Sequence, residues 1–344
     1  MDPIRVVVVD DSAFARKVIS EALGAHPAVQ IVGAARDGLD ALEKIAQLEP
    51  DVVTLDLVMP ALDGVGVIHA LAGSPLPRIV VVSTLGSDHA LAVEALRAGA
   101  VDMVTKPTAA ATPRLYEMAQ ELVQKVIDAA SATTQRHPHP VPAVTPAVAA
   151  LAADVIVIGT STGGPQALSH LLPALPAELP VPVLTALHIP AGYTASLAER
   201  LDAASALPIV EAHDRMLVEA GKAILARGGL HMSVLRLTTG QPAVHLDVRP
   251  LSARHVPSVD ILMQSAAQVY GGRVLAVVLT GMGEDGLLGA AAVRAAGGRV
   301  LTEAASSCIV YGMPRAVAEA GLSNGTYALP RMATGILEHL GERS

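Results

Sequence analysis

The sequence predicts an α/β protein of two doubly wound domains, each with a parallel sheet between layers of helices. Three observations favour this class. The chain has 344 residues, enough for two domains of about 150 residues each. Short apolar runs alternate with helical stretches, and these runs are continuous, which is typical of strands buried on both faces. A proline-rich segment divides this pattern into two parts.

The first part, residues 1–125, has predicted strands separated by predicted helices. The strands are expected at residues 5–9, 29–34, 52–57, 78–83 and 101–104. The helices are expected at residues 14–23, 38–47, 90–98 and 112–130. Residues 126–150 are predicted to hold the end of the last helix and an extended linker. This linker has little to bury, and its prolines block both helix and sheet.

The second part, residues 151–344, repeats the α/β pattern without repeating any motif. Its strands are expected at residues 155–158, 181–187, 223–226, 244–248, 274–279 and 299–302. Its helices are expected at residues 165–172, 193–203, 259–270, 286–296 and 315–320. Because the chain is 51% hydrophobic but only 2% aromatic, both cores are expected to consist of Ala, Val, Leu and Ile.

Composition excludes several classes of protein. The net charge of −8 argues against a nucleic-acid partner, and the second part has no basic helix. The apolar stretch at residues 141–158 is interrupted by Pro142, Pro146 and Asp154, so no membrane insertion is expected. The single cysteine, Cys308, has no internal partner for a disulfide, which fits a cytoplasmic protein.

Five polar residues lie at the ends of predicted strands of the first part. Asp10 and Asp11 end the first strand, Asp56 ends the third and Ser83 ends the fourth, and Lys106 follows the fifth. The carboxyl ends of parallel strands meet at one edge of a sheet, where ligands of such folds bind. Three carboxylates there suit Mg²⁺, and a carboxylate beside a cation and an ammonium group can accept a phosphoryl group. Alone, paired acids after a strand would be a solvated loop or a helix cap.

These residues resemble the receiver domains of two-component response regulators. The resemblance rests on Val9-Asp10-Asp11-Ser12, Leu55-Asp56-Leu57-Val58-Met59-Pro60 with Asp63-Gly64, Ser83, and Gly99-Ala100-Val101-Asp102 through Lys106-Pro107. It implies a flavodoxin-like fold, Asp56 as phosphoacceptor, Asp10, Asp11 and Asp56 as Mg²⁺ ligands, and Ser83 and Lys106 as contacts of the phosphoryl group. Met103 stands where many receivers have an aromatic switch residue, and this departure bears on an aromatic-coupled switch but not on phosphorylation.

A serine follows the first strand of the second part, in Gly159-Thr160-Ser161-Thr162-Gly163-Gly164. Such a turn can cradle a phosphate, but no dinucleotide or P-loop motif is present. The turn can instead expose the Ser161 hydroxyl, with backbone N–H groups facing a developing oxyanion. A helix N-cap is the ordinary role of a lone serine at this position.

A nucleophilic serine needs a base and an acid that orients the base. His188 follows residues 181–187 and Asp285 follows residues 274–279, so one sheet edge can bring both to Ser161. Taken singly, His188 could be a loop histidine and Asp285 a helix N-cap. Glu284 is a rival acid. Together the three strand-end positions favour a Ser–His–Asp triad.

The second part resembles the CheB family, the protein-glutamate methylesterases of bacterial chemotaxis. The resemblance rests on Ile158-Gly159-Thr160-Ser161-Thr162-Gly163-Gly164, Leu187-His188-Ile189-Pro190, Pro257-Ser258-Val259-Asp260, Leu279-Thr280-Gly281-Met282-Gly283-Glu284-Asp285-Gly286 and Val310-Tyr311-Gly312-Met313-Pro314-Arg315. It implies a Rossmann-like methylesterase domain with Ser161 as nucleophile, His188 as base and Asp285 as orienting acid. It places Thr162 and Met282 beside the substrate carbonyl.

The same resemblance implies an activity and its partners. The substrates would be glutamyl methyl esters on methyl-accepting chemotaxis receptors, and specific receptor glutamines would be deamidated. The chemotaxis histidine kinase CheA would supply the phosphoryl group, and phosphorylation would activate the enzyme. No cofactor is expected for the ester hydrolysis. Three residues depart from the family pattern: Arg227 replaces a proline, Val256 a frequent arginine and Glu303 a frequent glutamine.

Three alternative functions differ from an esterase in what they require of the sequence. A DNA-binding regulator would need a cationic surface, which the balance of charges does not favour. A silent scaffold would keep the fold without a reactive Ser161, and labelling by a serine-directed phosphonate distinguishes it from an enzyme. A zinc hydrolase is disfavoured because the 12 histidines are scattered and form no metal motif.

Overall fold

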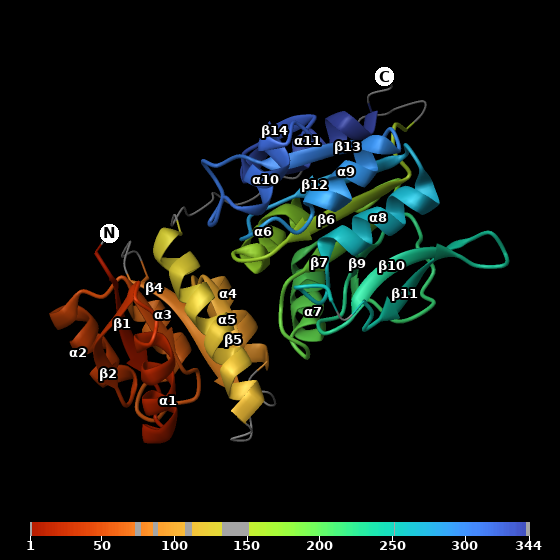
Figure 1. Ribbon diagram of the computed structural model, residues 1–344. Helices are drawn as coiled ribbons and strands as arrows, with labels where there is room; N and C mark the ends of the chain where they lie inside the picture. The colour runs from red at the N-terminus through yellow and green to blue at the C-terminus, as the bar shows by residue number, and fades with distance from the viewer. Residues whose placement is uncertain are drawn as a thin grey trace. The chain divides into compact units, whose positions relative to one another are not determined.

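The chain forms two compact units, Met1–Thr134 and Gln135–Ser344 (Figure 1). The structure, a computed structural model, describes residues 2–72, 77–84, 89–106, 112–132, 151–250 and 252–341. Residues 133–150, which contain the predicted linker, lie outside the described residues.

The first unit is a parallel sheet with helices between its strands. Its elements are β1 (Ile4–Val9), α1 (Ala13–Gly24), β2 (Val29–Ala35), α2 (Gly38–Leu48), β3 (Val52–Leu55), α3 (Gly64–Ala70), β4 (Arg78–Thr84), α4 (His89–Ala98), β5 (Asp102–Lys106) and α5 (Thr112–Ser131). The strand order is β2-β1-β3-β4-β5, and every pairing is parallel. This is the flavodoxin-like order, in which ligands bind where the strand order reverses, between β1 and β3.

The second unit has a larger parallel sheet and a separate two-stranded ribbon. Its elements are β6 (Val155–Thr160), α6 (Gly164–Leu171), η1 (Leu172–Ala174), β7 (Val183–Leu187), α7 (Thr194–Ala204), β8 (Ile209–Glu211), β9 (Ala223–Leu225), β10 (His231–Arg236), β11 (Pro242–Asp247), α8 (Val259–Tyr270), β12 (Val274–Val278), α9 (Leu287–Ala295), β13 (Arg299–Glu303), α10 (Met313–Glu319), β14 (Gly325–Tyr327) and α11 (Leu329–Gly341). The order of the main sheet is β14-β13-β12-β6-β7-β9-β8.

Helices cover both faces of this sheet. Helix α8 packs against α9, which also contacts α10, while α6 packs against α7 and α11 (Figure 1). The central strands β6, β7 and β12 are buried at every position, as their continuous apolar sequences predict. The doubly wound α/β class predicted for both parts is therefore confirmed.

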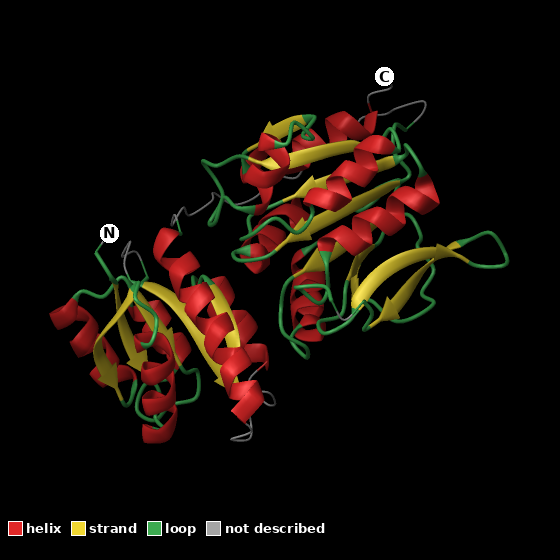
Figure 2. Ribbon diagram, in the orientation of Figure 1, coloured by secondary structure: helices red, strands yellow, loops and turns green. Residues whose placement is uncertain are grey.

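The β10–β11 ribbon departs from the predicted pattern. Residues 244–248 were expected to form a strand of the α/β pattern, but β11 pairs antiparallel with β10, which the sequence pattern did not indicate. Figure 2 shows this ribbon standing apart from the main sheet. The ribbon packs on α8, and its buried Met232 and Val234 alternate with the partly exposed Ser233 and Leu235. The structure also has β8, β14, α3 and α11, for which no element was predicted.

No helix in the described residues is both long and apolar enough to cross a membrane.

Candidate functional site

The first unit gathers acidic residues at the carboxyl edge of its sheet. Asp10 directly follows β1 and Asp56 directly follows β3, and both are buried, whereas Asp11 is exposed. Lys106 ends β5 and places Nζ 2.6 Å from Oδ2 of Asp10 and 2.6 Å from Oδ2 of Asp56. The structure therefore brings together four of the five residues singled out at this edge. The fifth, Ser83, is buried on β4.

Burial and the neighbouring charges shift the pKa values of Asp56 and Lys106 in opposite directions. Burial raises the pKa of Asp56 above its usual value, although Lys106 works to lower it. Burial alone would lower the pKa of Lys106, but its hydrogen bonds to Asp10 and Asp56 raise the pKa instead. The Asp56 carboxylate is thus held beside the Lys106 cation in a largely buried position, where a change in its charge has large effects.

The acidic edge has the donor set of a magnesium site. Carboxylate oxygens of Asp10, Asp11 and Asp56 lie within 4.8 Å of one another. Hard oxygen ligands are those that Mg²⁺ prefers, and Lys106 offsets only one of the three negative charges. The hydroxyl of Ser83 is buried without a hydrogen-bond partner in the described residues, so it can take a ligand atom. The residues present therefore fit the cation.

In the second unit, a tight turn after β6 presents Ser161. Gly163, with φ of +79°, is the residue before α6, and a Cβ there would lie 2.7 Å from Ile309. Only glycine fits both conditions. The Ser161 N–H donates to the Thr280 carbonyl at 3.1 Å, which fixes the start of the turn to the segment after β12. Ser161 is partly exposed.

His188 lies between Ser161 and an acid. It directly follows β7, and its backbone N–H donates to the Thr160 carbonyl at 3.1 Å. Its Nδ1 lies 3.0 Å from Oγ of Ser161, and its Nε2 lies 2.7 Å from Oδ2 of Asp285. An ionised Asp285 can only accept, so Nε2 carries the ring proton and Nδ1 is the basic nitrogen that faces Ser161.

Asp285 is locked in place by the amino end of α8. Its Oδ2 accepts from the Val259 N–H at 2.8 Å, and its Oδ1 accepts from the Asp260 N–H and the Ser258 hydroxyl, both at 3.0 Å. Burial would raise the pKa of Asp285, but the hydrogen bond and charge of His188 and these backbone donors together hold the pKa below its usual value. Asp285 therefore stays ionised and orients the imidazole.

Asp260 makes the reciprocal contact. Its Oδ1 accepts from the N–H groups of Gly286 and Gly289 at the start of α9, at 2.9 and 2.6 Å. Burial raises the pKa of Asp260 to about 6. The starts of α8 and α9 thus cap each other through two aspartates, and this exchange fixes the loop that contains Asp285.

The alternative roles considered for these residues do not match the structure. The N-cap of α6 is Gly163 and that of α9 is Gly286, so neither Ser161 nor Asp285 caps the helix that follows it. Glu284, the rival acid, is exposed.

Other residues of the site were not singled out from the sequence. Thr280 connects the turn, because its carbonyl accepts from Ser161 N–H and from the Thr160 hydroxyl at 2.7 Å. Glu303, noted only as a departure from a family pattern, accepts from the Thr280 N–H. The ring of His255 stacks on His188 with centroids 4.1 Å apart. The segment Pro257-Ser258-Val259-Asp260 could have indicated the α8 cap, because Ser and Asp are typical of helix starts. The stacking of His255 on His188 leaves no sequence pattern.

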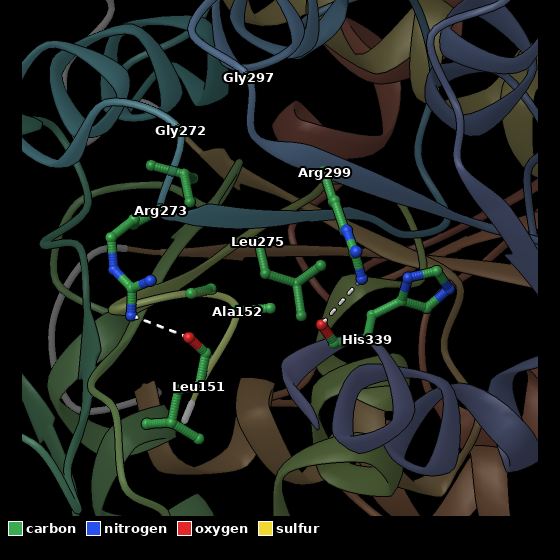
Figure 3. Close-up of a pocket in the computed structure, with 10 residues that line it drawn as sticks. Leu151, Ala152, Gly272, Arg273, Leu275, Gly297, Arg299 and His339 are labelled. Carbon is green, nitrogen blue, oxygen red and sulfur yellow. Dashed lines mark hydrogen bonds between the residues drawn. The ribbon is translucent and has the colours of Figure 1, made fainter. Parts of the chain in front are cut away.

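A pocket of about 350 Å³ lies at the opposite edge of this sheet, where β12 and β13 begin (Figure 3). Arg273 points to Leu151, and Arg299 points to His339. The Arg273 guanidinium is already paired with Asp154 through two hydrogen bonds of 2.6 and 2.7 Å. This pocket is separate from the Ser161 site.

Both parts of the chain match known families. Residues 156–336 match the CheB methylesterase family, and residues 6–120 match the response regulator receiver domain. The protein-glutamate methylesterase/protein-glutamine glutaminase 5 of Myxococcus xanthus is 53% identical over 99% of both chains. The protein-glutamate methylesterase/protein-glutamine glutaminase of Symbiobacterium thermophilum is 42% identical over 99% of this chain and 98% of that protein.

A solved structure matches the second unit. The crystal structure of the Thermotoga maritima CheB methylesterase catalytic domain is 36% identical, covers 54% of this chain and 98% of that chain, and has a TM-score of 0.53. With a family match over more than half of the chain and relatives of full length, the chain belongs to the CheB methylesterase family, in the form that also has a response regulator receiver domain.

Proposed function

We propose that this protein is a protein-glutamate methylesterase and protein-glutamine glutaminase of chemotaxis receptors, with Ser161 as its nucleophile. The observation that carries the proposal is the continuous line of hydrogen bonds from Ser161 through His188 to Asp285. The names of the full-length relatives supply the substrate class.

The first half of the reaction forms an acyl-enzyme. Oγ of Ser161 attacks the carbonyl carbon of the γ-glutamyl methyl ester, and Nδ1 of His188 takes the hydroxyl proton. Asp285 holds the ring through Nε2 and stabilises the imidazolium that forms. When the tetrahedral intermediate collapses, His188 returns this proton to the departing methoxide and methanol leaves.

The developing oxyanion needs donors beside Ser161. We place it near the backbone of Thr162 and Met282, in line with the family resemblance. Two observations support this position. Thr162 directly follows the nucleophile, and a Cβ on Gly281, the residue before Met282, would lie only 2.7 Å from Cβ of Ser161. Backbone N–H groups fixed in this way stabilise an oxyanion without having to reorganise.

The second half of the reaction releases the acid. His188 takes a proton from water, which attacks the acyl carbon, and Ser161 leaves with that proton as the glutamate carboxylate forms. Deamidation of a glutamine uses the same attack, with ammonia in place of methanol as the first product.

The receiver unit is proposed to control this activity. Asp56 accepts the phosphoryl group, Lys106 offsets its charge and the Ser83 hydroxyl donates to one of its oxygens. Asp10, Asp11 and Asp56 would hold Mg²⁺, which would supply positive charge to offset that of the phosphoryl group. The phosphodonor is proposed to be the histidine kinase CheA. A cytoplasmic location follows from this kinase and this substrate.

Release of methanol from a methylated receptor tests the proposal. The purified chain should release methanol and Ser161→Ala should not, while Thr162→Ala should retain appreciable activity. Methanol release that survives in Ser161→Ala and is lost in Thr162→Ala would move the nucleophile to Thr162. No release by any variant would refute the proposed activity.

A further inference from the structure

Glu303 is a buried carboxyl group in the wall of the Ser161 site. It ends β13 and is fully buried. Its Oε2 accepts from the Thr280 N–H at 2.8 Å, and its Oε1 accepts from the Ser307 hydroxyl at 2.9 Å. No ion pair to Glu303 is formed by the described residues. A buried carboxylate without a cation is costly, so its presence calls for an explanation.

Thr280 transmits this contact to the nucleophile. Val278 is the last residue of β12 that pairs with β13, so the Thr280 N–H lies beyond the sheet ladder and the Glu303 side chain supplies its acceptor. The Thr280 carbonyl accepts from the Ser161 N–H at 3.1 Å. The Thr280 hydroxyl donates to the Thr162 carbonyl at 3.0 Å. One residue thus connects Glu303 to both ends of the nucleophile turn.

The hydrogen bonds of Glu303 and Ser307 can all be satisfied both when the Glu303 carboxyl is ionised and when it is protonated. When Glu303 is ionised, the Ser307 hydroxyl donates to it. When Glu303 is protonated, its own O–H can donate to Ser307, whose hydroxyl then turns to the Ala304 carbonyl at 3.3 Å. In both forms Ser307 accepts from the Leu329 N–H at 2.9 Å, and Glu303 still accepts from Thr280.

The two forms differ in charge close to the reacting atoms. The sheet order β13-β12-β6-β7 puts Glu303 two strands from Ser161 and three from His188. At about 4.8 Å per strand, an ionised Glu303 disfavours the oxyanion at Ser161 more than it favours the imidazolium at His188. The groups that act on Glu303 are the Thr280 amide, the Ser307 hydroxyl and the thiol of Cys308, which burial keeps neutral by raising its pKa.

We infer that Glu303 is a positioning residue of the esterase: through Thr280 it holds the Ser161 turn, and the turn is more reactive when the Glu303 carboxyl is neutral. Burial raises the pKa of Glu303 to about 7, so both forms are populated near neutral pH. The inference rests on the proposed role of Ser161 as nucleophile.

Two substitutions separate the effect of the hydrogen bond between Glu303 and Thr280 from the effect of the Glu303 charge. Glu303→Gln keeps an acceptor for Thr280 and a donor for Ser307, as in the protonated form, but cannot ionise. Glu303→Leu removes the acceptor. The probe is a fluorophosphonate, and the rate of Ser161 phosphonylation per folded protein is measured from about pH 6 to about pH 8.5, on either side of the Glu303 pKa. Glu284→Gln is the matched control, because it removes an exposed carboxyl of the neighbouring loop.

We expect the ratio of Glu303→Gln to wild type to be near one at acidic pH and to rise to about threefold above the Glu303 pKa, which is the net of the two charge effects at an effective dielectric constant of about 20. The Glu284→Gln ratio should stay constant. Glu303→Leu should be slower at every pH, by about tenfold to a hundredfold.

A Glu303→Gln ratio that does not change with pH would overturn the inference, and so would Glu303→Leu labelling as fast as wild type. If Glu303→Leu does not fold, the Glu303→Gln ratio decides by itself. A wild type that is not labelled on Ser161 would instead contradict the proposed function, because the probe needs a reactive serine and no receptor.

Discussion

Replacing Asp285 by asparagine should remove the charge beside His188 and also break one of the hydrogen bonds that hold the Asp285 side chain. Each carboxylate oxygen accepts two hydrogen bonds, and each faces one backbone N–H, from Val259 or from Asp260. An amide has one NH₂ group, so either orientation of the asparagine side chain sets two donors against each other. With NH₂ at the Oδ2 position, His188 must also move its proton to Nδ1, and that nitrogen can then no longer accept from Ser161.

The size of the effect follows from these contacts. Loss of the orienting acid costs up to about 10⁴-fold in turnover in a comparable triad, which is about 5 kcal/mol of transition-state stabilisation. The unsatisfied backbone N–H should cost a further 1–3 kcal/mol or so of folding stability. We therefore expect the Asp285→Asn substitution to lower kcat by about 10³-fold to 10⁴-fold, with little change in KM, and to lower the melting temperature.

Steady-state methanol release gives kcat and KM, and thermal unfolding gives the stability. Glu284→Gln is the control, since the Glu284 side chain is exposed and should be nearly silent. If Asp285→Asn kept more than about a tenth of the wild-type kcat while Glu284→Gln lost it, the acid would be misassigned.

Three further substitutions test other parts of the account. Gly281→Ala should lower kcat at least tenfold or so, because the new methyl group would lie 2.7 Å from Cβ of Ser161. A wild-type kcat in this variant would show that the neighbouring residues move to make room for the methyl group. Glu303→Gln should gain stability over wild type as pH rises. The folded state keeps the Glu303 proton up to a pKa of about 7, whereas the unfolded state loses it near 4.5. Wild type therefore loses up to about 3 kcal/mol across this window and the variant loses none, as urea unfolding at both ends would show. Asp56→Asn should hold the full-length enzyme at its basal rate, while a small-molecule phosphodonor with Mg²⁺ activates only the wild type; equal activation of both would exclude Asp56 as the acceptor.

The fold class could be predicted because continuous apolar strands and intervening helices are local patterns. Strand β6 is an example, since all its residues are buried and its sequence is apolar throughout most of its length. The short strands β8 and β14 have only three residues each, too few to show a period. A strand was predicted at residues 244–248, but the antiparallel pairing of β10 with β11 could not be predicted, because the burial of this ribbon comes from α8, which lies later in the chain.

The sequence could predict that the residues of the candidate site lie at one edge of the sheet. Ser161, His188 and Asp285 follow strands β6, β7 and β12, and parallel strands end at one edge. The contacts that hold these side chains were not predictable. The capping of α8 by Asp285 depends on the path of two loops, and the connection from Glu303 to Ser161 passes through a backbone amide.

The most direct test of the central claim is to trap the covalent intermediate. The full-length chain is mixed with a receptor peptide that has a glutamyl methyl ester, quenched in acid during the first turnover, digested and examined by mass spectrometry. We predict an acyl adduct on the peptide that contains Ser161, formed with release of one methanol per adduct and absent from Ser161→Ala. An adduct on another residue, or steady methanol release without any adduct on Ser161, would contradict the account.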